Sequence, residues 1–257
     1  MQERAAAVEL RALRKRYDAK LAVDGVDLSV PAGSFFGLVG PNGAGKTTTL
    51  KMATGLLRPD EGTAVVAGID VWADPVAAKA RMGVLPEDLR LFDRLTGTEL
   101  LMYNGLLRSM PKPTIESRTG DLLDVLGLSD AGGTMVVDYS QGMRKKIALA
   151  ASLLHAPAVL FLDEPFESVD PVSARTIREV LQRFTSGGGT VVFSSHVMET
   201  VERLCDRVAI LHAGRVVAAG AVDAVRRGRS LEDVFVELVG AGQVVGGRLG
   251  WLSSSSG

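Results

Sequence analysis

The sequence predicts an α/β fold in which helices flank a mixed β-sheet and an α-helical subdomain is inserted into the chain. Short apolar runs alternate with helical patterns over most of the 257 residues, which is typical of a sheet covered by helices. A glycine-rich loop lies between one expected strand and the helix after it. Residues 91–154 differ, because they have helical spacing and few β-rich runs. These three observations together predict the fold class.

The expected strands are short, apolar and bounded by turn residues. Pro157 directly precedes one of them, and the three glycines at 187–189 precede another. The helical middle is interrupted at residues 111–113 and 131–133, so we expect several short helices there. The main elements are a helix over 46–57 and strands over 34–39, 63–66, 158–162, 190–194 and 208–211.

Composition limits the function classes. Lys and Arg number 29 against 30 Asp and Glu, a net charge of −1, which disfavours a nucleic-acid binder that acts by broad charge neutralisation. The apolar fraction of 46% suits a globular core. One cysteine, Cys205, excludes an intrachain disulfide and fits a reducing compartment. No run reaches the ~20 apolar residues of a spanning helix, and no secretory signal is expected.

The most specific motif is a phosphate-binding loop. Residues 40–47 read Gly-Pro-Asn-Gly-Ala-Gly-Lys-Thr and match G-x-x-x-x-G-K-[ST] between a strand and a helix. Backbone N–H groups and the helix N-terminus in such a loop bind phosphate oxygens. We expect Lys46 to reach the β- and γ-phosphates and Thr47 to ligate Mg²⁺. The predicted nucleotide contacts are Gly40, Pro41, Asn42, Gly43, Ala44, Gly45, Lys46, Thr47 and Thr48.

Two adjacent acids follow the apolar run that ends at Leu162. Asp163 and Glu164 would then lie at the carboxyl edge of the sheet, where open α/β folds bind ligands. Asp163 would hold Mg²⁺ directly or through water. Glu164 would be the general base for the attacking water. A simple charged strand cap is the alternative interpretation of this pair.

With these motifs and three further segments, residues 6–240 resemble the ATP-binding subunit of ATP-binding cassette (ABC) transporters. Tyr17 matches the aromatic residue on which this family stacks adenine. Residues 139–143, Tyr-Ser-Gln-Gly-Met, stand where the family has Leu-Ser-Gly-Gly-Gln. Ser140 and Gly142 are kept, and the three other positions differ. The resemblance implies that Ser140, Gln141 and Gly142 contact nucleotide, although a plain helix cap is the alternative for Ser140.

Three more positions take their roles from the resemblance. Asp170 resembles a residue of the segment that crosses the family's dimer interface and is expected to contribute to nucleotide binding. His196 matches the histidine that touches the γ-phosphate and holds the catalytic carboxylate, so the implied catalytic set is Glu164, His196 and Lys46. Glu87 stands where most members have glutamine, and it could also ligate the metal.

The resemblance implies one cassette at 6–240, followed by a Gly/Ser-rich tail at 241–257. A RecA-like phosphate-loop core would occupy about 6–86 and 156–220, and the helical insertion about 87–155. The implied function is an ATP-hydrolysing motor subunit of a transporter. Two segments resemble exporter-type members of the family, namely Leu-Pro-Glu at 85–87 and the closing segment at 231–238. Its cofactors would be ATP and Mg²⁺.

The implied partners are a polytopic membrane subunit on a separate chain and a second cassette, identical or paralogous, paired head to tail. We expect no nucleic acid, and a cytoplasmic protein bound peripherally to the membrane. The alternatives are a soluble ABC-type ATPase acting on ribosomes or DNA, and an ATP-gated regulatory module with little turnover. We expect residues 144–146, Arg-Lys-Lys, to be a solvated helix face and Cys205 to be a packing residue.

Overall fold

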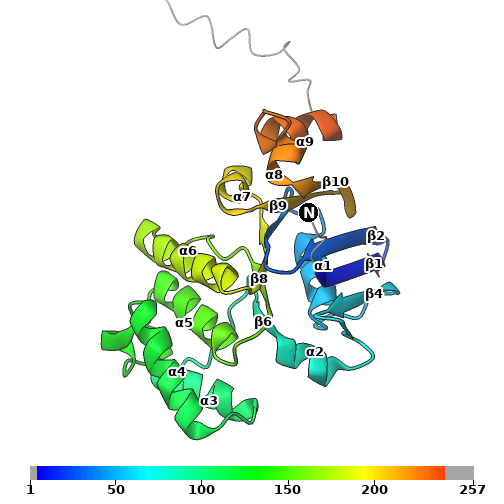
Figure 1. Cartoon of the computed structure of the whole chain (residues 1–257). Helices are drawn as coiled ribbons and strands as arrows, with labels where there is room; N and C mark the ends of the chain where they lie inside the picture. Colours follow the sequence, from blue (N-terminus) through cyan, green and yellow to red (C-terminus); the bar gives the residue numbers. More distant parts are fainter. Residues whose placement is uncertain (1–4, 241–257) are drawn as a thin grey trace, which may run out of the picture.

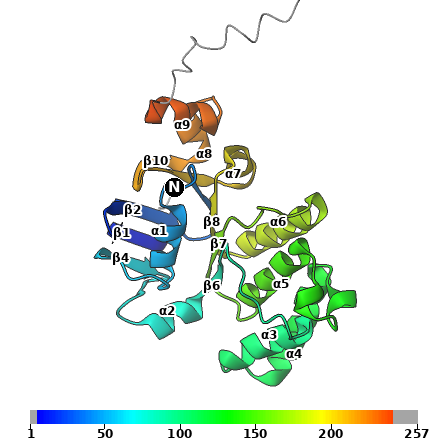
Figure 2. The same cartoon turned by 180° about the vertical axis from the view of Figure 1, so that it is seen from behind.

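The computed structural model describes residues 5–240, and Figures 1 and 2 show how their strands and helices are arranged. The predicted tail at 241–257 lies outside these residues. The strands are β1 Ala6–Tyr17, β2 Lys20–Pro31, β3 Phe35–Val39, β4 Glu61–Val66, β5 Ile69–Asp70, β6 Met82–Leu85, β7 Val159–Asp163, β8 Thr190–Ser195, β9 Arg207–His212 and β10 Arg215–Ala221. The helices are α1 Lys46–Ala53, α2 Pro75–Arg81, α3 Gly97–Leu107, α4 Lys112–Val125, α5 Gln141–Leu153, α6 Pro171–Ser186, α7 Met198–Leu204, α8 Val222–Arg226 and α9 Leu231–Val239, with 3₁₀ turns at Ser129–Ala131 and Val136–Asp138.

The central sheet is mixed, as the sequence predicts. Its strand order is β10-β9-β3-β8-β7-β6. All neighbours from β9 to β6 are parallel, and β10 pairs antiparallel with β9 through a tight turn. Because β3, β7 and β8 run the same way, Val39, Asp163 and Ser195 end at one edge of the sheet. That edge positions the candidate site.

A second, antiparallel sheet lies beside the first. Its order is β2-β1-β4-β5, where the sequence indicated one mixed sheet. Strands β1 and β2 are long and mix buried with charged positions, including the exposed Arg11 and Arg16. Such strands show no continuous apolar run, so their pairing was not evident from the sequence.

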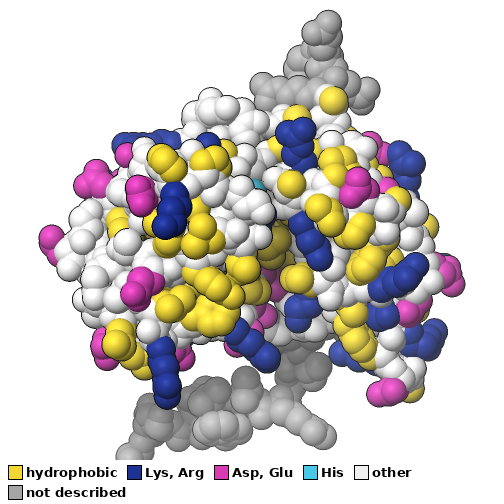
Figure 3. All heavy atoms as spheres, turned by 90° about the horizontal axis from the view of Figure 1, so that it is seen from below, with side chains coloured by type: hydrophobic (Ala, Val, Ile, Leu, Met, Phe, Trp, Pro, Cys, Tyr) yellow, Lys and Arg dark blue, Asp and Glu magenta, His cyan; other side chains and the backbone are white. Residues whose placement is uncertain are grey.

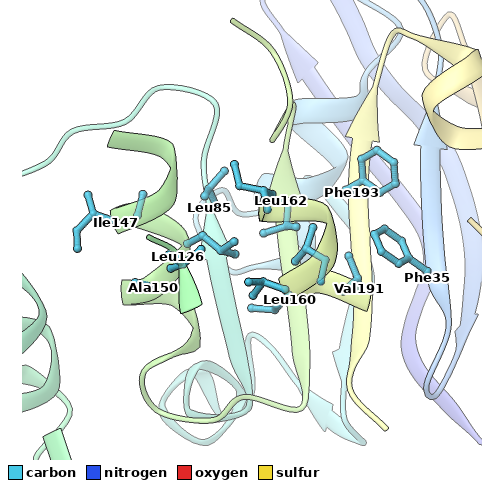
Figure 4. Close-up of a cluster of buried hydrophobic side chains, with 14 of the residues drawn as sticks. Phe35, Leu85, Leu126, Ile147, Ala150, Leu160, Leu162, Val191 and Phe193 are labelled. Atoms are coloured by element: carbon cyan, nitrogen blue, oxygen red, sulfur yellow. The ribbon is translucent and has the colours of Figure 1, made fainter. Parts of the chain in front are cut away.

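The segment from α3 to α5 forms the predicted helical insertion (Figure 1). Helices α3 and α4 approach closely at Gly105, where a Cβ would lie 2.6 Å from the Ile115 side chain. The lack of a side chain at Gly105 allows this approach. In Figure 4, Ala150 of α5 and Leu126 lie beside the strand residues Leu85, Leu160 and Leu162, whereas Ile147 points to the other side of α5. This contact joins the helical insertion to the central sheet.

Helix α1 is shorter than the sequence predicts, whereas Cys205 behaves as expected. The helix ends at Ala53 rather than at 57, because Gly55 turns the chain at φ +69° and the Thr54 hydroxyl donates to the Leu50 carbonyl. Cys205 packs against the core beside α7, as predicted, and burial raises the pKa of its thiol. Within residues 5–240, no helix combines the length and the apolarity needed to cross a bilayer.

Candidate nucleotide-binding and catalytic site

The phosphate loop connects β3 to the N-terminus of α1. Gly45 precedes the helix at φ +105°, and a Cβ at that position would lie 2.7 Å from the Ala22 carbonyl oxygen. Only glycine fits both restrictions without strain. The Lys46 ammonium folds back over the loop and donates to the carbonyl oxygens of Gly40, at 2.8 Å, and Pro41, at 3.3 Å. The loop is therefore closed around its own lysine.

A hydroxyl and a carboxylate meet beside the loop. Thr47 Oγ1 donates to Asp163 Oδ1 at 3.2 Å. Ser194 Oγ donates to the same carboxylate oxygen at 2.5 Å, because β7 and β8 pair Asp163 with Ser194. The sheet register thus fixes Asp163 against the first turn of α1. Ser194 was not among the residues that the sequence singled out.

Glu164 lies at the centre of the charged groups. Its Oε1 atom is 3.2 Å from His196 Nδ1 and 3.5 Å from Lys46 Nζ. Glu164 and Lys46 are both buried, and His196 is half-exposed. The attraction between this carboxylate and the Lys46 ammonium offsets part of the solvation that both groups lose on burial. The imidazole contact leaves the carboxylate oriented toward the loop.

These groups open into a cleft of about 410 Å³. Most of the predicted loop residues line it, and Tyr17, Glu87, Glu164 and His196 lie on the same walls. Three further residues were missed. Lys20 and Ala22 follow Tyr17 in the β1–β2 hairpin, and Glu167 closes a turn after Glu164. The full lining is Tyr17, Lys20, Ala22, Asn42, Gly43, Gly45, Lys46, Thr47, Thr48, Glu87, Glu164, Glu167 and His196.

The segment with Ser140, Gln141 and Gly142 does not line this cleft. Ser140 is the N-cap of α5, and its hydroxyl accepts from the Met143 N–H at 3.2 Å. A Cβ on Gly142 would lie 2.6 Å from both Asp170 Oδ2 and Ser173 Oγ. Packing against Asp170 and Ser173 within the chain therefore requires glycine at position 142, which the sequence did not reveal.

Asp170 caps the neighbouring helix, α6. Its carboxylate accepts from the N–H groups of Ser173, at 2.9 Å, and Val172, at 3.1 Å. These hydrogen bonds, that from Ser173 most of all, lower the pKa of Asp170. The N-termini of α5 and α6 thus meet at Gly142, on a part of the surface separate from the cleft.

The prediction that residues 144–146 form a solvated face is wrong. Lys145 and Lys146 are buried, at 4% and 9% exposure. Lys145 Nζ donates to the main-chain oxygen of Glu164 at 2.9 Å. Arg144 donates to Asp93 Oδ1 and to the Val136 carbonyl, both at 2.9 Å. The pattern misled because α5 packs between the sheet and other helices and buries more than one stripe.

The donor set suits a hard divalent cation bound together with phosphate. Thr47 and Asp163 offer a hydroxyl and a carboxylate, both oxygen ligands. Among residues 5–240, no cluster of three or more His, Cys, Asp or Glu side chains could enclose a metal. Mg²⁺ is usually held by one or two carboxylates, substrate phosphates and water rather than by a protein cage. The residues present therefore fit Mg²⁺ with a nucleotide.

Comparisons with known proteins agree with this geometry. The family model described as ABC transporter matches residues 23–167. The chain is 40% identical to the daunorubicin/doxorubicin resistance ATP-binding protein DrrA of Streptomyces peucetius over 214 residues, which are 83% of this chain and 65% of that protein. It is 38% identical to the ABC transporter ATP-binding protein NatA of Bacillus subtilis, over 83% of this chain and 87% of NatA.

A solved structure of an ATP binding subunit of an ABC transporter superposes with a TM-score of 0.84 at 31% identity. The match covers 91% of this chain and 99% of that one. The chain aligns with slightly less than two thirds of the length of DrrA.

Proposed function

This chain belongs to the ABC transporter family and is an ATPase of that family, and from this premise we propose that it is the motor subunit of an exporter. Names of similar proteins support export. They include the linearmycin resistance ATP-binding protein LnrL of Bacillus subtilis, at 36% identity over 81% of this chain, and the Nod factor export ATP-binding protein I of Ralstonia nicotianae, at 38% over 83%. The observation that carries the proposal is Glu164 held between Lys46 and His196 beside the phosphate loop.

In the proposed binding mode, Tyr17 stacks on adenine at one end of the cleft and the loop amides of residues 40–48 hold the phosphates. Lys46 leaves its carbonyl partners for the β- and γ-phosphates. Thr47 and Asp163 would hold Mg²⁺, with Glu87 as a further ligand. The bound ion would neutralise charge on the phosphate oxygens. The distance of 3.2 Å between Thr47 Oγ1 and Asp163 Oδ1 supports a shared cation.

In the proposed reaction, a water attacks the γ-phosphorus and its proton passes to the Glu164 carboxylate as the bond to the leaving ADP oxygen breaks. His196 orients that carboxylate through Nδ1 and contacts the γ-phosphate. Lys46 stabilises the charge that builds up on the transferred group. The left-handed backbone of Glu164, at φ +46°, supports a functional constraint at this residue.

We further propose head-to-tail pairing with a second cassette, identical or paralogous. Ser140, Gln141, Gly142 and Asp170 would then complete the partner's nucleotide site. Their position outside the chain's own cleft supports this pairing. We retain the division into a core at about 6–86 and 156–220 and a helical insertion at about 87–155 as part of the proposal.

The proposed membrane partner is a polytopic subunit on a separate chain, with this subunit on the cytoplasmic face of the membrane. A groove of about 210 Å³ lies where β6 leads into α3, lined in part by Pro86, Leu89 and Phe92. Phe92 is more than half exposed there, as is Leu107, the last residue of α3. Figure 3 shows hydrophobic side chains gathered beside a hollow on the face seen from below. Exposed apolar residues of this kind favour contact with another protein.

The first experiment replaces the proposed base. We expect Glu164→Gln to lower kcat for ATP by about 10²–10⁴-fold, because a general base contributes that much. Affinity for a fluorescent ATP analogue should stay within about threefold, since the amide keeps the size of the side chain. Glu167→Gln is the matched control. Glu167 is an acid that lines the same cleft, but Lys46 and His196 pair with Glu164 and not with Glu167. Full turnover in Glu164→Gln would refute the assigned base.

The transport assignment needs a separate test. The tagged chain would be recovered from native membranes in mild detergent, and the proteins that accompany it would be identified. A polytopic membrane protein in roughly equal amount is the expected result. Recovery from the soluble fraction, or with ribosomes or DNA, would overturn the proposal of a transport motor without affecting the assignment of the ATP site.

A further inference from the structure

Lys145 is a buried charge that the proposed reaction does not use. It lies on α5, five residues after the N-cap Ser140, and is 4% exposed. Burying an ammonium group is costly unless it is paired and hydrogen-bonded. Its hydrogen bond runs to the main-chain oxygen of Glu164, at 2.9 Å. A buried lysine is thus directed at the backbone of the proposed catalytic base.

The electrostatic surroundings of Lys145 are acidic. Burial lowers the pKa of the Lys145 ammonium, but the charges of Glu167, Glu87, Asp163 and Glu164 favour the charged form. Three of these acids, Glu87, Glu164 and Glu167, line the cleft. The ammonium of Lys145 therefore provides positive charge close to these acids, in addition to that of Lys46.

The backbone of Glu164 needs support. Its φ of +46° is in the left-handed region, which a residue with a Cβ adopts only when its surroundings impose it. Side chains hold both of its peptide groups. The Ser194 hydroxyl accepts from the Glu164 N–H at 2.9 Å, and Lys145 Nζ donates to the Glu164 carbonyl. The first support comes from β8 and the second from α5, so the two flanking elements together hold the Glu164 main chain from which the carboxylate extends.

We propose that Lys145 is a positioning residue that couples helix α5 to Glu164. Through this bond, a shift of the α5 N-terminus, where Ser140 to Gly142 would meet the partner's nucleotide, moves the Glu164 main chain. The ammonium also balances the extra negative charge of Glu87 and Glu167. The inference rests on the proposed role of Glu164 as the base. It adds a residue outside the cleft to the groups that set the rate of hydrolysis.

A double-mutant cycle with the complete chain tests the coupling. Lys145→Met removes the charge and the donor and keeps a similar length. The readouts are kcat and KM, measured from release of radiolabelled phosphate, and the binding stoichiometry of a fluorescent ATP analogue. The phosphate release of Lys46→Met serves as the blank and is subtracted from every rate. We expect kcat per bound nucleotide to fall about tenfold while KM stays within about twofold, because the lost contact acts on the base and not on binding.

The second arm repeats the change in a Glu164→Gln background. We expect Lys145→Met to add less than a twofold loss there, since a residue that acts through Glu164 has nothing left to position. Lys146→Met is the matched control, a buried lysine next along the same helix, whereas the bond to Glu164 comes from Lys145. Any effect of Lys146→Met should multiply with that of Glu164→Gln.

The outcomes separate this inference from the proposed function. If Glu164→Gln is inactive and Lys145→Met keeps its kcat, or if the two losses multiply, the coupling is refuted and the base assignment stands. If Glu164→Gln keeps full turnover, the base assignment itself fails. If Lys145→Met does not fold, Lys145→Gln, which keeps an N–H donor without the charge, is put through the same cycle and judged by the same criterion.

Discussion

Two glycines of the phosphate loop have left-handed backbones but differ in the space around them. Gly43 has φ +80°, and a Cβ there would meet open space, whereas a Cβ on Gly45 would lie 2.7 Å from the Ala22 carbonyl oxygen. We expect Gly43→Ala to cost about 1–2 kcal/mol of unfolding free energy, the usual cost of this conformation. Gly45→Ala should cost at least about 1 kcal/mol more, because backbone atoms must move. Urea unfolding of both variants measures the difference, and equal losses would contradict the steric argument.

At the same scale, residues could be predicted from the sequence when their roles depend on near neighbours along the chain. The loop from Gly40 to Thr47 and the pair at 163–164 are contiguous, so the sequence indicates both the local structure and the chemistry. Lys145 was misjudged, because its burial depends on how α5 packs between the sheet and other helices. Ser194 was missed for a related reason, since its bond to Asp163 comes from the pairing of β8 with β7.

At the scale of elements, His155 joins the end of α5 to β6. Its Nε2 donates to the Met82 carbonyl at 3.0 Å. Burial, with the nearby charges of Arg108 and Arg118, lowers the pKa of His155 from 6.5 to about 4. The unfolded chain therefore binds a proton below about pH 6.5, and the folded chain does so only near pH 4. Acidification through this window favours unfolding.

We expect the wild type to lose about 2 kcal/mol through this group between about pH 7.5 and 4.5, less than the full linkage value because the ring is partly exposed. His155→Gln does not titrate and should lose less stability over the same range. Chemical unfolding of both proteins at the two pH values gives the comparison. Parallel loss of stability in the two proteins would show that His155 is not the group responsible.

The elements themselves were predicted unevenly. Strands β3, β7, β8 and β9 are continuous apolar runs, and each was located within one or two residues. Strands β1 and β2 were not placed, because their burial alternates irregularly and their pairing contains register shifts. The end of α1 was placed too late, since its apolar pattern continues past the Gly55 turn. Continuous burial on both faces is what makes a strand visible in one sequence.

At the scale of the whole molecule, the ordered motifs identified the family, but a single chain leaves the proposed nucleotide site divided. Ser140 and Gly142 lie at the start of α5, and the cleft is lined by other residues. In the proposed head-to-tail pairing, their arrangement in a working site depends on a second chain, which no contact within residues 5–240 supplies. Neither the sequence nor the fold of one chain could therefore fix the composition of the complete site.

Mixing two inactive variants tests whether sites are shared between chains. Lys46→Met disables the loop, and Ser140→Asp places a charge against the partner's phosphates while keeping a good helix cap. In a two-fold dimer, each variant alone has two defective sites, whereas a mixed dimer has one intact site. Random pairing at equal amounts should restore about a quarter of wild-type turnover, because half of the dimers are mixed and half of their sites are intact.

The matched control mixes Lys46→Met with Thr47→Val, two changes in the same loop. Every site in that mixture contains one defective loop, so no turnover should return, whatever the pairing. Phosphate release measured across mixing ratios distinguishes the cases. Recovery that peaks at equal amounts, in the first mixture alone, requires the phosphate loop of one chain and Ser140 of another to act on the same ATP. If phosphate release stays low at every ratio in both mixtures, each chain hydrolyses ATP with its own residues. Ser140 would then have to move to the cleft of its own chain.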